Sequence, residues 1–131
     1  KVGNTAPDIQ LTDSMKLSDI KKSTLLVFGA SSCIHCKEQT KDLDKFYKSW
    51  KEEHELEIVY ISLDTNKSEY ENFYKKKTWN SYCDYQGWET KAAKDYYVDA
   101  TPTYLLLDEN RKILLHPKSL VHADVWINNR L

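Results

Sequence analysis

Short apolar runs and longer amphipathic segments alternate along this chain of 131 residues. Residues 25–28 form an apolar run that is too short for a helix and is typical of a buried strand. Residues 57–63 form a second run, rich in β-branched and aromatic side chains, which predicts a central strand. Residues 103–107 and 112–115 flank a turn at residues 108–110, and this arrangement predicts a β-hairpin.

Between these strands the apolar residues recur with the period of a helix. Leu43, Phe46, Tyr47 and Trp50 lie at i, i+3, i+4 and i+7, which predicts the buried face of a long helix beginning near Ile34. A shorter helix is predicted at three aromatic positions: Tyr70, Phe73 and Tyr74. Three polar residues before it are candidate N-caps: Asp64, Thr65 and Asn66.

The two ends of the chain and one internal segment give weaker signals. Alternation at Ile9 and Leu11 predicts a short first strand, whereas residues 79–88 are aromatic and are predicted to be irregular. A brief helix is expected at residues 91–97. A last helix, introduced by Ser119, is predicted to place four apolar side chains on one face: Leu120, Ala123, Ile127 and Leu131.

This order of elements predicts the fold class. A parallel strand–helix–strand unit followed by an antiparallel hairpin and a terminal helix is typical of a three-layer α/β sandwich around a mixed sheet. We expect residues 1–131 to form one domain, because the chain can bury a core and shows no linker or repeat. Since it begins at Lys1 and not at Met, we also expect it to be a piece of a longer protein.

Composition and charge narrow the functional classes. The formal net charge of −1 gives no reason to expect binding to nucleic acid or to acidic membranes. No apolar stretch approaches the roughly 20 residues that span a bilayer. Three cysteines are too few for a disulfide framework, because Cys33 and Cys36 stand together and Cys83 is left over. This usage indicates a functional dithiol.

Cys33 and Cys36 carry the chemistry that the sequence predicts. They follow the apolar run at residues 25–28 and open the long helix, where the positive end of the helix dipole stabilises a thiolate. Cysteines three residues apart on a first helical turn lie close enough to form a disulfide. We expect Cys33 to be the more exposed and to attack, and Cys36 to resolve the mixed disulfide.

Two further elements of the sequence belong to this candidate site. His35 lies between the cysteines and is expected to stabilise the thiolate, which would make the disulfide more oxidising. The Thr101–Pro102 bond enters a predicted strand, and a bond of this type is a candidate for the cis form. The backbone of Thr101 would then lie against Cys33, where a substrate peptide can pair with it.

With these motifs the chain resembles the thioredoxin-fold oxidoreductases of the TlpA/ResA-like branch. The resemblance is carried by residues 3–9, 17–20, 26–36 and 97–108, and it covers nearly the whole chain. It implies a thioredoxin-like fold, a redox-active disulfide at Cys33 and Cys36, a cis Thr101–Pro102 bond and an extracytoplasmic setting. It also implies a substrate groove, to which Thr101, Pro102 and Ile34 are assigned.

Four positions depart from the pattern of that branch. Ser32 stands where a tryptophan is usual, and Ile34 stands where proline, glycine or glutamate is common. Val27 replaces the buried aspartate of thioredoxin, and Gln39 replaces a glutamate that the branch often carries. Proton transfer to Cys36 would then have to use water or another group.

Several functions remain open from the sequence. The first is a protein thiol–disulfide oxidoreductase, which needs no bound cofactor because the dithiol carries two electrons. The second is a redox-sensing or partner-binding module, and a peroxidase is a weaker third. A zinc site would need two more ligands than Cys33 and Cys36 supply, so no metal is expected.

Cys83 is interpreted as a half-buried side chain, with a third redox thiol as the alternative. For the partners, we expect protein thiols and disulfides, an upstream redox partner, a monomeric state, and membrane association only through a tether outside this chain.

Overall fold

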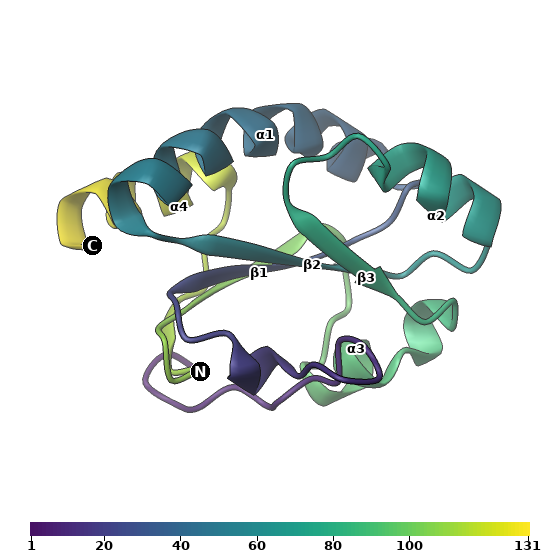
Figure 1. Ribbon diagram of the computed structural model, residues 1–131, viewed down its shortest axis with the longest axis horizontal. Coiled ribbons are helices and arrows are strands. Elements are labelled where there is room, and N and C mark those ends of the chain that lie inside the picture. The colour runs from purple at the N-terminus through teal and green to yellow at the C-terminus, as the bar shows by residue number, and fades with distance from the viewer.

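A mixed five-stranded sheet forms the centre of the computed structural model, which describes all 131 residues (Figure 1). Its strand order is β3-β2-β1-β4-β5. The strand bounds are Thr24–Gly29 for β1, Glu57–Ser62 for β2, Asn80–Cys83 for β3, Thr103–Leu107 for β4 and Ile113–Leu115 for β5. Strands β1, β2 and β3 run parallel, whereas β4 is antiparallel to both β1 and β5. The predicted hairpin is therefore confirmed.

Helices cover both faces of this sheet, as Figure 1 shows. The helix bounds are Ile34–His54 for α1, Lys67–Tyr74 for α2, Lys91–Asp95 for α3 and Leu120–Arg130 for α4, with short 3₁₀ turns at Leu17–Asp19 and Gly87–Glu89. Helices α1, α2 and α4 lie on one face, and α3 lies on the other with the N-terminal segment. The predicted three-layer thioredoxin-like α/β sandwich is confirmed. None of these helices is both long enough and apolar enough to cross a membrane.

Alternation along the central strands produces two separate cores. Ile58 and Tyr60 of β2 face the core under α1 and α4, where Trp50 is fully buried. Val59 and Ile61 face the second core, which the N-terminal segment and α3 complete. Because β1 and β2 are buried on both faces, they read as continuous apolar runs, which is why the sequence shows them clearly.

Two predictions about single strands are wrong. Ile9 and Leu11 form no strand, because the chain turns back at once and pairs only through an isolated bridge between Gln10 and Lys16. Residues 79–88 are not wholly irregular, since Asn80–Cys83 forms the edge strand β3. An edge strand with half-buried side chains lacks the apolar run by which β1 and β2 are recognised.

The ends of three helices also differ from the predicted ones. Asn66 is the N-cap of α2, and its side chain accepts a hydrogen bond from the Glu69 amide at 2.9 Å, so Asp64 and Thr65 are not caps. Helix α3 ends at Asp95 because Tyr97 adopts a left-handed φ of 54° in a Schellman-type helix end. Leu131 lies beyond α4 and is exposed, so it does not join the buried face.

Candidate active site

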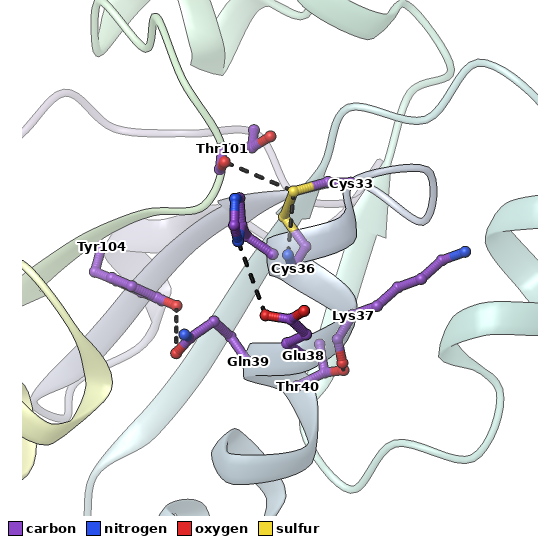
Figure 2. Close-up of polar contacts among 9 residues, drawn as sticks. Cys33, Cys36, Lys37, Glu38, Gln39, Thr40, Thr101 and Tyr104 are labelled. Carbon is purple, nitrogen blue, oxygen red and sulfur yellow. Dashed lines mark hydrogen bonds and ion pairs between the residues drawn. A yellow bond between two sulfur atoms is a disulfide. The ribbon is translucent and has the colours of Figure 1, made fainter.

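Cys33 and Cys36 lie where strand β1 ends and helix α1 begins (Figure 2). They form a disulfide, with their Cα atoms 5.1 Å apart. Cys33 is the N-cap of the 21-residue helix, and its sulfur accepts a hydrogen bond from the Cys36 amide at 3.1 Å. In the reduced state the same amide and the positive end of the helix stabilise negative charge on the Cys33 sulfur.

The two cysteines differ in their access to solvent. Cys33 is half-buried, whereas Cys36 is 1% exposed and lies against the interior of the domain. Of the two cysteines, Cys33 is therefore the one that is accessible from solvent. Ile34 between them is 71% exposed and presents an apolar surface beside the reachable sulfur.

The loop before β4 approaches Cys33 from the opposite side. The Thr101–Pro102 peptide bond is cis. The carbonyl oxygen of Thr101 lies 3.6 Å from the Cys33 sulfur, although the two residues are 68 positions apart in the chain (Figure 2). A reduced Cys33 thiol can donate a weak hydrogen bond to this oxygen.

His35 does not contact the disulfide through a hydrogen bond in this structure. Its Nδ1 atom lies 3.8 Å from a carboxylate oxygen of Glu38, three residues further along α1. Both side chains are well exposed, at 79% for His35 and 68% for Glu38. An exposed ion pair of this kind is weak and screened by salt.

A buried carboxylate that the sequence interpretation missed supports the loop in front of Cys33. Asp64 is 5% exposed and accepts hydrogen bonds from the backbone amide of Ser31 at 3.1 Å and from the Ser31 hydroxyl at 2.6 Å. The Ser62 hydroxyl donates to its second oxygen at 2.6 Å. These bonds tie the end of β2 to the segment two residues before Cys33.

Known proteins share this fold. A sequence profile described as thioredoxin-like matches residues 21–113, which is more than half of the chain. The chain belongs to the thioredoxin-like family.

Two curated relatives and one solved structure resemble this thioredoxin-like domain. Tryparedoxin of Trypanosoma brucei brucei is 29% identical over 90 residues, which cover 68% of this chain and 62% of tryparedoxin. Probable nucleoredoxin 1 of Arabidopsis thaliana is 30% identical over 104 residues, which cover 76% of this chain and 18% of that protein. The matched part thus spans less than two thirds of either relative.

The solved structure matches over nearly the full length of both chains. A thiol–disulfide oxidoreductase from Bacteroides fragilis NCTC 9343 superposes with a TM-score of 0.86 at 26% identity, covering 98% of this chain and 100% of that one. The predicted resemblance to thioredoxin-fold oxidoreductases is confirmed. Like that oxidoreductase, the thioredoxin-like domain has the thioredoxin fold, and its CxxC pair lies at disulfide distance.

The remaining cysteine of this thioredoxin-like domain lies apart from the pair. Cys83 is the free cysteine, half-buried at the end of β3. Its thiol donates to the backbone oxygen of Asp64 at 3.4 Å and accepts from the Tyr85 amide at 3.4 Å. Burial raises the pKa of the Cys83 thiol, which disfavours the reactive thiolate.

Proposed function

We propose that this domain exchanges disulfides with protein substrates, with Cys33 as the attacking thiol and Cys36 as the resolving thiol. The observation that carries the proposal is the asymmetry of the pair: Cys33 is half-buried at a helix N-terminus, and Cys36 is 1% exposed behind it. An attacking thiol must reach its substrate, whereas a resolving thiol needs only to reach its neighbour.

The electrons and bonds of the exchange reaction balance without any cofactor. The Cys33 thiolate attacks a sulfur of the substrate disulfide, and the other substrate sulfur leaves as a thiolate. Cys36 then loses its proton to solvent and attacks the Cys33 sulfur, which breaks the mixed disulfide and releases the second substrate sulfur. Two electrons pass from the dithiol to the substrate, and the Cys33–Cys36 disulfide forms. The reverse sequence oxidises a substrate dithiol.

A turnover assay distinguishes this enzyme from a domain that only binds partners. The reduced domain is mixed with a disulfide-bonded model protein such as insulin in the presence of excess dithiothreitol, and precipitation of the freed chains is followed. An oxidoreductase accelerates precipitation at catalytic concentrations. A redox-sensing or partner-binding module leaves the rate unchanged at those concentrations, and this result would favour the alternative function.

Thr101, Pro102 and Ile34 are proposed to line the substrate groove beside Cys33. The apolar side chain of Ile34 is 71% exposed next to the attacking sulfur, so it can pack on the side chains that flank a substrate cysteine. We expect Ile34→Ser to raise the KM for a peptide disulfide about threefold to tenfold, which corresponds to roughly 1 kcal/mol of lost apolar contact. Exchange with glutathione, which makes few such contacts, should be almost unchanged. An equal change for both substrates would remove Ile34 from the groove.

His35 is proposed to stabilise the Cys33 thiolate and so to favour the reduced state. The exposed ring needs only to leave Glu38 to approach the sulfur, because that pair is weak. We expect His35→Ala to shift the equilibrium with glutathione toward the disulfide by up to about tenfold, a potential about 30 mV more negative. Glu38→Gln is the control, since it frees the ring and should shift the equilibrium in the opposite direction. An unchanged equilibrium in His35→Ala would exclude this role.

The setting and partners are also proposals. We infer that residues 1–131 act as one monomeric domain with an extracytoplasmic location, supported by the resemblance to the TlpA/ResA-like branch, and that an upstream redox partner restores its dithiol or disulfide. Any membrane association would use a tether outside this chain. Trapping with Cys36→Ser in extracts of the source cells, followed by identification of the linked proteins and their compartments, tests these points together.

A further inference from the structure

A narrow internal space lies directly behind the buried cysteine of the pair. It is too small to hold a water molecule. Its lining residues come from α1, β1, β2 and the start of β4: Val27, Cys36, Gln39, Thr40, Leu43, Tyr60, Pro102 and Tyr104. None of these side chains is charged. A hydrogen bond to the Cys36 sulfur from this side must therefore come from one of the lining side chains and not from water or an ion.

Most of the polar groups in this space already have partners. The Thr40 hydroxyl donates to the Lys37 carbonyl at 2.9 Å, and the Tyr104 hydroxyl donates to Gln39 at 3.4 Å (Figure 2). The Tyr60 hydroxyl is different, because it is fully enclosed and makes no well-formed hydrogen bond; its polar neighbour is the Tyr74 hydroxyl, which is buried and unpaired as well. A buried polar group without a partner costs free energy, so its retention calls for an explanation.

The surrounding sheet fixes where the Tyr60 hydroxyl lies. Tyr60 pairs across the strands with Val27, the position at which thioredoxin carries a buried aspartate. Its ring reaches along β1, so that a Cβ atom added at Gly29 would overlap the hydroxyl. Stacking on Trp79, with ring centroids 4.7 Å apart, holds the ring from the other side. These contacts hold the ring in place.

The protonation state of Tyr60 determines what its hydroxyl can do. Burial raises the pKa of Tyr60 to about 12, so the phenol keeps its proton under physiological conditions. It can therefore donate a hydrogen bond but cannot act as a base. In the oxidised protein the disulfide sulfur of Cys36 is a poor acceptor, whereas a thiolate is a strong one.

We propose that the Tyr60 hydroxyl is the hydrogen-bond donor to the Cys36 thiolate, in the place where related proteins use a buried carboxylate. This inference rests on the resolving role proposed for Cys36. When Cys36 loses its proton to solvent, the Tyr60 hydroxyl donates to the resulting anion and stabilises it until it attacks the Cys33 sulfur. The hydroxyl keeps its own proton throughout. The Tyr60 hydroxyl, which makes no well-formed hydrogen bond in the oxidised structure, therefore gains the Cys36 thiolate as its acceptor during turnover.

Tyr60→Phe tests the proposal, because it removes the hydroxyl and keeps the ring. A background of Cys33→Ser and Cys83→Ser leaves Cys36 as the sole cysteine, and ¹³Cβ-labelled cysteine reports its ionisation by NMR. We expect Tyr60→Phe to raise the pH midpoint of Cys36 ionisation by about one unit, the size of a modest charge-assisted hydrogen bond. Tyr47→Phe is the matched control, since it removes a core phenol that bonds Glu57 and does not line this space. It should leave the midpoint unchanged.

The resolving step gives a second readout. In a Cys83→Ser background, reaction of the dithiol with Ellman's reagent is followed by attack of Cys36, which releases the second coloured thiolate. A rise of one unit in the midpoint makes the thiolate fraction of Cys36 about tenfold smaller at neutral pH. A thiolate with a higher pKa is also more nucleophilic, which partly offsets this loss, so Tyr60→Phe should slow the release about threefold. An unchanged midpoint, or an equal shift in Tyr60→Phe and Tyr47→Phe, would overturn the role of Tyr60. The NMR midpoint requires no exchange activity, so failure of the proposed function would appear separately, as absence of turnover with a shifted midpoint.

Discussion

Replacing Cys33 by serine is expected to abolish disulfide exchange, and replacing Cys36 by serine is expected to stop it after the first step. Of the two cysteines in the pair, Cys33 is the accessible one, so its loss removes the attacking thiol and returns the rate to that of the uncatalysed reaction. Without Cys36 the mixed disulfide on Cys33 has no internal resolving thiol, and it should accumulate in a one-to-one complex. Non-reducing electrophoresis and mass spectrometry detect that complex directly.

Cys83→Ser is the control for this pair of variants. Cys83 is half-buried, has a raised pKa and belongs to β3, so its removal should leave turnover near the wild-type rate. If Cys36→Ser turned over normally, the resolving role of Cys36 would be wrong. If Cys33→Ser formed the complex through Cys36, the two roles would have to be exchanged.

Replacing Asp64 by alanine is expected to cause the largest loss of stability among the residues near the site. The change leaves the Ser31 amide and the hydroxyls of Ser31 and Ser62 buried without their acceptor. Loss of these charge-assisted bonds should lower the free energy of unfolding by about 3–5 kcal/mol. Exchange should also slow, because the loop that ends at Cys33 loses its anchor. Chemical denaturation and the insulin assay measure the two effects.

Two variants distinguish the loss of the Asp64 hydrogen bonds from the general effect of removing a carboxylate. Asp64→Asn retains one acceptor oxygen and should lower the free energy of unfolding by less than Asp64→Ala does. Asp8→Ala removes an exposed carboxylate that accepts bonds from Ser18 within the N-terminal segment, and it should reduce stability only slightly with no change in exchange rate. A stability loss for Asp64→Ala no larger than that for Asp8→Ala would contradict the anchoring role.

The parts of the fold that were predictable are those whose sequence signal is local. Strands β1 and β2 are continuous apolar runs because both faces are buried, and α1 shows the period of its inner face. The CxxC pair is equally local, since two cysteines, a helix start and a preceding strand follow one another in the chain. The carbonyl of Thr101 reaches Cys33 from 68 positions away, and the Thr101–Pro102 bond together with the resemblance to a family indicated this neighbourhood.

The parts that were not predictable depend on contacts between distant segments. Asp64 looks like a helix cap in sequence, and only the packing of β2 against the β1–α1 loop places Ser31 over it. Tyr60 looks like an ordinary strand residue until Gly29 and Cys36 are placed around its hydroxyl. Edge strand β3 depends on pairing with β2 and has no apolar run of its own.

The equilibrium reduction potential of the Cys33–Cys36 pair tests the central claim most directly. The domain is equilibrated in glutathione buffers of graded poise, and the oxidised fraction is determined by alkylation and mass spectrometry in a Cys83→Ser background. We predict a reversible two-electron transition between about −270 and −120 mV, the range of thioredoxin-fold oxidoreductases, with His35 placing it toward the oxidising end. Failure of the disulfide to form at any poise would contradict the claim that this pair is a redox centre.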